Sequence, residues 1–498
     1  MGSGKQPVYL RHYLADLNVQ SVLEEPNYFD RDYLSEFSSF YGVSSHGYIN
    51  RCRRCRFFSY IVDRKEMEAA LGGDADALGR MREHYRGFVV LRPIPTAPLG
   101  RTVLSWYPDP AALTTPRVTK PSRVYECLVA GLTLGVKGIA WQQQDTGVSA
   151  CATVALWSML HSSAFDAHHA IPTTADITRY AHRTASLGSR VFPSDGLTVE
   201  QAGEAIKESG LEPEIVAGDY QRGNLRGFTR DKFSACVATL IRSGYPVLIG
   251  GRVGNSSDKY HAVCAVGFRE CSPPVPTAGS VNLQDSGIRH LYLHDDNLGP
   301  SVRFEIRTDP SGRFVRLKAS APSPLHRMSL PADPTSRYPE LIPSYLIAAV
   351  HENLRTRLSY FLKNSRDLAR DLLKAYAGAV RRGLLTDPKG GLTVCTRFAK
   401  VGDYVGADLE IPFGPTSPTL GRVRLELAER VPPMSLYVGV VRIGRGAKPL
   451  MEVLFDTTDA NANHRPFCNL QFDPTMGALI DLLQRNGTIN LGITVKAY

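Results

Sequence analysis

The residue with the clearest chemical potential is a cysteine that follows a polar turn and begins an apolar segment. Residues 142–149 are rich in Gln, Asp, Gly and Ser, and Cys151 opens an apolar stretch with helical spacing. Ser149 is a candidate N-cap, so we expect Cys151 in the first turn of a helix. The unpaired N–H groups and the dipole of a helix start stabilise anions, and a thiol there tends to ionise below its usual pKa of about 8.5. The thiolate is a nucleophile.

A nucleophilic cysteine needs a base and a group that orients this base. Downstream, His261 begins an apolar strand, and Asp295 ends another. If the second strand persists through Asp296, successive side chains point to opposite faces, and only one acid can meet His261. We expect Asp295 to be that acid. The glutamines of the polar turn, which include Gln144, could donate an N–H to a developing oxyanion.

This ordered set resembles the papain-like cysteine peptidases, and within them the bacteriocin-processing (double-glycine leader) peptidase branch. The resemblance covers about residues 140–306, and it includes two shorter segments, 195–198 before a helix and 243–247 before a strand. It implies a papain-like fold and a peptidase activity on a protein or peptide substrate, with no cofactor and no metal ion. The roles that it implies are nucleophile for Cys151, general base and acid for His261, orienting acid for Asp295 and oxyanion donor for Gln144.

Two positions depart from the family pattern. Ala152 stands where the family has Gly after the nucleophile, and Gln144 lies one residue further from the cysteine than the family's glutamine, whose place is taken by Asp145. These departures motivate an alternative, a catalytically inactive papain-like scaffold used for binding. A transglutaminase or deamidase is a further alternative, because both reactions use the same groups as peptide hydrolysis.

The elements that must position these residues are helices first and strands second. Helices are predicted over residues 151–162, 198–209 and 231–242, and strands over 245–251, 261–268 and 290–297. This order predicts an α+β fold with a papain-like core, in which a helical half and an antiparallel strand half enclose the cleft. We place this core at residues 121–315.

Two further regions flank the predicted core. Residues 1–120 form an N-terminal region of unknown role. A Pro-rich segment over residues 315–343 predicts a boundary, after which residues 344–498 should form a C-terminal domain that begins with a helical hairpin over 344–385 and continues as strands. This domain is the expected site for a protein partner.

Two motifs of the N-terminal region have competing explanations. Cys52 and Cys55 supply at most half of a zinc site, and two ordinary thiols are the favoured interpretation. Arginines at 51, 53, 54 and 56 form a basic cluster, for which a solvated face is the simplest explanation and nucleic-acid binding the disfavoured alternative.

Composition sets broad limits. The 498 residues predict two or three domains, and 43% hydrophobic with 21% charged residues is typical of globular proteins. The formal net charge of +10 is thinly spread over this length and does not indicate a particular acidic partner. Nine irregularly spaced cysteines favour a reducing compartment over a disulfide framework. No secretory signal and no apolar run of membrane-spanning length is visible, so we expect a cytoplasmic protein without membrane attachment.

Overall fold

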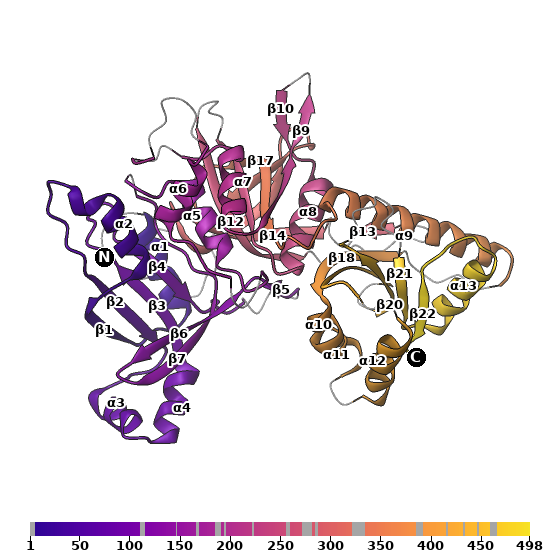
Figure 1. Cartoon of the computed structure of the whole chain (residues 1–498), viewed down its shortest axis with the longest axis horizontal. Coiled ribbons are helices and arrows are strands. Elements are labelled where there is room, and N and C mark those ends of the chain that lie inside the picture. Colours follow the sequence, from indigo (N-terminus) through magenta and orange to yellow (C-terminus); the bar gives the residue numbers. More distant parts are fainter. Residues whose placement is uncertain are drawn as a thin grey trace. The chain divides into compact units, whose positions relative to one another are not determined.

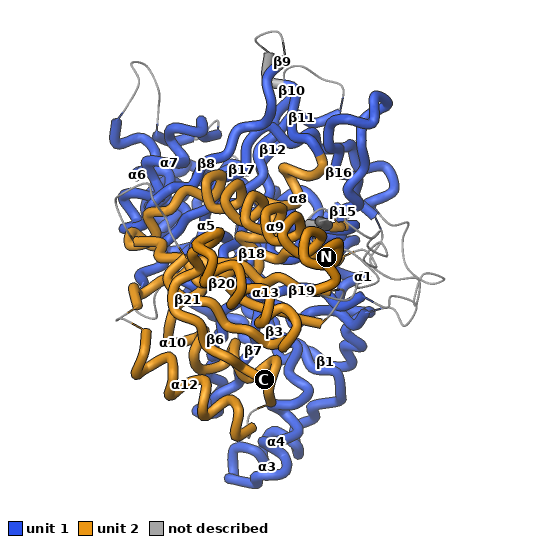
Figure 2. Tube along the Cα trace, turned by 90° about the vertical axis from the view of Figure 1, so that its right-hand side faces the viewer, with its two compact units in different colours: residues 1–229, 244–269, 289–350 blue, residues 230–243, 270–288, 351–498 orange. Residues whose placement is uncertain are grey.

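The computed structural model describes most of the chain in two compact units that are interleaved along the sequence (Figure 2). Unit 1 comprises residues 1–229, 244–269 and 289–350, and unit 2 comprises residues 230–243, 270–288 and 351–498. The fold class is mixed α+β, with 35% helix and 35% strand. The described residues are 5–109, 115–145, 147–165, 169–184, 191–193, 196–221, 224–254, 259–270, 281–283, 287–320, 334–384, 392–414, 417–431, 434–445, 448–458 and 466–498.

The N-terminal part of unit 1 contains a four-stranded antiparallel sheet in the order β1-β2-β3-β4. Its strands are β1 (Ser21–Tyr28), β2 (Cys52–Phe58), β3 (Tyr85–Leu91) and β4 (Leu99–Leu104). The helices of this part are α1 (Lys5–Asp16), α2 (Arg31–Ser39), the 3-10 turn η1 (Tyr41–Val43), α3 (Arg64–Leu71) and α4 (Ala75–His84). A separate hairpin follows, formed by β6 (Arg123–Val129) and β7 (Leu132–Gly138).

Three helices come next in unit 1, and two of them begin with a capping box. α5 (Cys151–Leu160) is apolar on every side and is buried throughout except at Cys151. α6 (Thr174–Ala181) and α7 (Val199–Glu208) each begin with a reciprocal capping box, formed by Thr173 with Asp176 and by Thr198 with Gln201. In Figure 1 these helices lie beside strands β12 and β17, and α5 contacts both β11 and β17.

The strands of unit 1 that follow close on themselves. Six strands pair in the order β11-β12-β14-β15-β16-β17. β17 also pairs with β11, which closes the six strands into a ring. These strands are β11 (Val247–Val253), β12 (Tyr260–Glu270), β14 (Ile288–Asp295), β15 (Gly299–Thr308), β16 (Val315–Ala319) and β17 (Leu341–Val350). β8 (Glu212–Ala217) pairs with β17, β5 (Arg117–Val118) pairs with β12, and β9 (Asp219–Gln221) forms a hairpin with β10 (Asn224–Gly227).

Unit 2 contains a six-stranded sheet in the order β13-β18-β19-β20-β21-β22. Its strands are β13 (Val281–Leu283), β18 (Leu392–Lys400), β19 (Tyr437–Arg445), β20 (Lys448–Asp456), β21 (Pro466–Gln471) and β22 (Ile493–Lys496). Its helices are α8 (Arg230–Arg242), α9 (Leu358–Arg381), α10 (Val401–Asp403), the π turn η3 (Tyr404–Asp408), α11 (Glu410–Phe413), α12 (Pro418–Arg430) and α13 (Pro474–Arg485).

Two sequence predictions of secondary structure were wrong. Residues 344–350, expected to begin a helix, belong to β17 and complete the ring in unit 1, so the predicted hairpin reduces to the single helix α9. Residues 423–427 lie within α12, although the sequence predicts that the domain continues as strands after residue 385. Both are short apolar stretches, whose periodicity does not distinguish a strand from a buried helix. Part of the Pro-rich segment, residues 321–333, lies outside the described residues, as does Asp195.

Candidate functional site

Cys151 is the first residue of α5, as the sequence predicts, but the cap differs from the expectation. The N-cap is Ala150, and no side chain caps the first turn. Ser149, the expected cap, instead donates its hydroxyl to Asp145 at 2.9 Å. The N–H groups at the start of a helix lack intrahelical partners, so this uncapped end can bind an anion beside Cys151.

The turn before Cys151 is built around the carboxylate of Asp145. Its Oδ1 accepts the N–H groups of Gly147 and Val148 at 2.7 Å each and of Ser149 at 3.3 Å. The backbone at Gly147 packs closely against the Phe40 ring. A Cβ at this position would lie 2.7 Å from the ring, so the site requires glycine. Asp145, which occupies the place of the family's glutamine, therefore holds the turn that presents Cys151.

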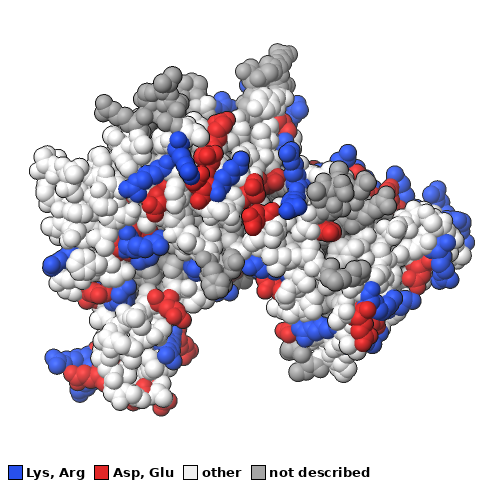
Figure 3. Space-filling model, viewed as in Figure 1, with Lys and Arg blue, Asp and Glu red and all other residues white. Residues whose placement is uncertain are grey.

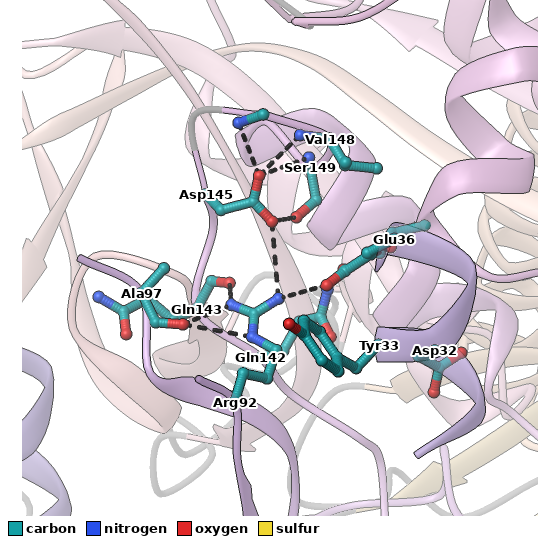
Figure 4. A network of polar contacts seen from close by, with 12 residues as sticks. Asp32, Tyr33, Glu36, Arg92, Ala97, Gln142, Gln143, Asp145, Val148 and Ser149 are labelled. Atoms are coloured by element: carbon teal, nitrogen blue, oxygen red, sulfur yellow. Dashed lines mark hydrogen bonds and ion pairs between the residues drawn. The ribbon is translucent and has the colours of Figure 1, made fainter. Parts of the chain in front are cut away.

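A buried arginine connects this turn to the N-terminal region (Figure 4). Arg92, which follows β3, donates to Glu36 on α2 at 2.8 Å, to the Gln143 carbonyl at 2.9 Å, and lies 3.6 Å from Asp145. Burial raises the pKa of Glu36 to about 7, against the opposing charge of Arg92. Residues 1–120, which the sequence left without a role, thus help to fix the turn before Cys151.

His261, near the start of β12, faces two consecutive acids. Its Nε2 lies 3.2 Å from Oδ1 of Asp295 and 3.3 Å from Oδ1 of Asp296. The prediction that only one acid could meet His261 was therefore wrong: β14 ends at Asp295, and the alternation of side chains ends with it.

The electrostatics of this group favour a protonated imidazole. Burial lowers the pKa of His261, but the charges of Asp295 and Asp296, with hydrogen bonds to Asp295 and Cys151, raise it well above its usual value. Burial also raises the pKa of Asp296 to about 7, against the opposing charge of His261. Because Nε2 of His261 faces the two acids, Nδ1 is the ring nitrogen that can interact with the Cys151 sulfur.

Asp295 is held by residues that the sequence did not single out. Its Oδ1 accepts the Asn297 N–H at 2.9 Å and the Tyr338 hydroxyl at 3.1 Å, and its carbonyl accepts the Trp141 indole N–H at 3.0 Å. Tyr338 is buried, and it comes from the segment predicted as an inter-domain boundary. No local pattern in the sequence marks it, because its partner is distant along the chain.

Gln144 is oriented by the same acidic turn. Its Nε2 donates to Oδ1 of Asn297 at 3.2 Å. Gln144 is not among the described residues that line the cavity at Cys151. The preceding glutamines serve the fold: Gln142 donates to Glu36, and Gln143 bonds the backbone near Leu99.

Unit 1 contains a cavity of about 470 Å³. Cys151 and His261 both line it. Apart from His261, the described side chains of its lining carry no charge; they include Leu197, Val199, Leu248, Tyr260, Tyr345 and Ile347. The thiol and the imidazole therefore share one largely uncharged cavity.

Three other histidines and thiols in the described part of this region, His294, His161 and Cys264, have structural surroundings. His294 bonds the Ile139 carbonyl and the Ser301 N–H, both at 2.9 Å, and burial lowers its pKa to about 4. His161 bonds the Tyr125 hydroxyl at 2.8 Å. Cys264 is fully buried, and burial raises its pKa. Among these groups, His261 alone faces carboxylates.

The N-terminal motifs have ordinary explanations. Cys52 and Cys55 are three residues apart on β2 and so point to opposite faces of the sheet, which argues against shared zinc ligation. Arg53 pairs with Glu24 on β1, at 2.6 Å, and Arg54 and Arg56 pair with Glu25. On the face drawn in Figure 3, positive and negative side chains are interspersed. Neither observation favours a nucleic-acid surface.

One group of side chains in the described part of the chain could hold a metal ion. His261, Asp295 and Asp296 each offer a ligand atom, and these atoms lie within 4.8 Å of one another. An imidazole with two carboxylates suits several divalent cations.

Comparisons with known proteins leave the family open. No protein-family model matches the chain, and no curated protein matches it by sequence. Within the described ranges, no helix has both the length and the apolar character needed to cross a membrane.

Proposed function

We propose that unit 1 carries a thiol acyl-transfer centre of the papain-like kind, which cleaves a peptide or isopeptide bond. One observation carries the proposal: Cys151 begins α5 and shares a cavity with His261, whose Nε2 lies 3.2 Å from Asp295. A nucleophile, a base and an orienting acid are the three groups that such chemistry needs. In this proposal, α5–α7 would act as the helical half of a papain-like core and the ring of strands as its strand half.

The reaction proceeds in two acyl transfers. The Cys151 thiolate attacks the carbonyl carbon, the C–N bond breaks, and the His261 imidazolium gives its proton to the leaving amine, which leaves a thioester. Water then attacks the thioester carbon while His261 takes a proton from it, the C–S bond breaks, and the carboxylic acid product leaves the Cys151 thiolate and the His261 imidazolium regenerated. Asp295 keeps the imidazole oriented in both steps.

The tetrahedral intermediates carry an oxyanion that needs donors. The uncapped first turn of α5 supplies the Cys151 N–H. Gln144, the donor implied by the family resemblance, uses one amide hydrogen on Asn297 and keeps a second for an oxyanion. The main-chain donor is the stronger candidate, because it belongs to a cavity-lining residue.

The test uses the full chain and a peptide acyloxymethyl ketone, an electrophile that modifies activated thiols. We expect one adduct by intact mass spectrometry in the wild type and none in Cys151→Ala. Cys55→Ala, which removes a partly exposed thiol from β2, should label like the wild type. Equal labelling of Cys151→Ala, or a wild type that never labels, would refute the proposal and favour the binding scaffold. Hydroxylamine or a primary amine added to a cleavable peptide then separates hydrolysis from transfer.

A further inference from the structure

Asp296 is a buried acid whose place in the site the proposed function leaves open. It is 2% exposed, and both of its carboxylate oxygens lack a hydrogen-bond partner within the described residues. His261 is the one cation that those residues bring within ion-pair distance of it. Burying a carboxylate without partners is costly, so the contact with His261 is the main source of compensation.

The two acids are held differently. Oδ1 of Asp295 is fixed by Asn297 and Tyr338, at 2.9 and 3.1 Å, in addition to His261. Apart from His261, no side chain of the described residues bonds the Asp296 carboxylate, and the Asp296 carbonyl accepts the Gln6 side-chain N–H at 3.2 Å. The imidazole carries a single Nε2 hydrogen, so one acid accepts it at a time while the other acts through its charge.

We propose that Asp296 is a second positioning carboxylate for His261, which stabilises the imidazolium beside Asp295 and replaces Asp295 when that acid is lost. The inference rests on the proposed function for its consequence in catalysis. The contact itself, 3.3 Å between Nε2 of His261 and Oδ1 of Asp296, does not depend on the proposed activity. The other charged or titratable groups around the acids are Cys151 on α5, Tyr338, and Lys5 of α1, whose ammonium lies 5.4 Å from the Tyr338 ring centre.

Two acids on one base predict a distinctive pattern among variants. With a single orienting acid, Asp295→Asn would remove most of the activity. With two, Asp295→Asn and Asp296→Asn should each slow acyloxymethyl ketone labelling about 10-fold, and the double variant should lose at least about 1,000-fold, because each acid partly replaces the other until both are lost and the two effects are therefore not additive.

The decisive readout is the titration of His261, followed by NMR with ¹⁵N-labelled histidine. An opposite charge at this distance shifts a pKa by about 1–3 units, so Asp296→Asn should lower the His261 midpoint by at least about one unit. Asp367→Asn, which removes an exposed acid of α9, should leave it unchanged. Asp296→Ser provides a second variant should the first fail to fold.

Three outcomes would separate the possibilities. An unchanged His261 midpoint and labelling rate in folded Asp296→Asn would overturn the inference. Labelling that EDTA abolishes and Zn²⁺ or Mn²⁺ restores would make Asp296 a metal ligand and would also overturn it. A wild type that never labels would refute the proposed function, while the midpoint would still decide whether Asp296 acts on His261.

Discussion

Two buried acids, one in each unit, show opposite behaviour. Glu452 on β20 is 1% exposed and Asp296 in unit 1 is 2% exposed, so both have lost their contact with water. Glu452 accepts hydrogen bonds from Arg442 at 2.7 Å and Tyr404 at 2.8 Å, and Arg397 lies 3.4 Å away. Within the described residues, the one ion-pair partner of the Asp296 carboxylate is the imidazole of His261.

The direction in which the pKa of each acid shifts depends on its cationic partners. Burial raises the pKa of Glu452, but Arg397 and Arg442 overcome this effect and leave it below its usual value. Burial raises the pKa of Asp296 to about 7, and His261 compensates only in part. Burial alone therefore does not decide the charge of an acid. A fully partnered acid stabilises its fold, whereas a poorly partnered one, in contact with a histidine that lines a cavity, is typical of a functional site.

Glu452→Gln should have the largest effect on stability. The substitution leaves two arginines facing a neutral amide, and breaking a buried ion pair costs about 3–5 kcal/mol. The folded-state pKa of Glu452 is depressed, so its contribution is present above the unfolded pKa of about 4.3 and is lost as pH falls through the folded value. Urea unfolding at pH 7 and pH 4 checks both points. If Glu452→Gln lowers the free energy of unfolding equally at pH 7 and pH 4, the charge of Glu452 does not stabilise the fold, and the contrast with Asp296 fails.

Asp296→Asn should have a smaller effect of the opposite sign. The folded state binds more protons than the unfolded state between about pH 4 and 7, so stability falls as pH rises through this window. Removing the charge should stabilise unit 1 by about 1–3 kcal/mol at pH 8 and by little at pH 4. Urea unfolding at these two pH values measures it. Destabilisation at pH 8 would mean that Asp296 has partners like those of Glu452.

Arg53→Ala should have the smallest effect on stability. Its pair with Glu24 is largely exposed on the N-terminal sheet, and exposed pairs are screened by water and salt. We expect an unfolding midpoint indistinguishable from that of the wild type in 150 mM salt. A clear loss of stability in Arg53→Ala would show that exposed ion pairs in this protein are not weak. The contrast drawn between the two buried acids would then lose its basis.

The sequence located the parts of the site that follow from local pattern. The apolar spacing after Cys151 placed it at a helix start, and the apolar strands placed His261 and Asp295 at strand ends. The rest depends on long-range packing. Tyr338 meets Asp295 only after the ring closes, and Arg92 reaches the nucleophile's turn only after the N-terminal sheet packs beside it. The second acid was missed because the strand was assumed to continue past residue 295.

The interleaving of the units has a consequence for how the chain becomes active as it is made. During synthesis, Cys151 emerges long before residues 341–350, which supply the last strand of the ring around His261. Residues 230–243 meanwhile belong to the second unit, whose main sheet is still unmade. A nascent chain therefore carries its reactive thiol without a finished acid–base partner. The enzyme that we propose would stay latent on the ribosome until its catalytic strands are complete.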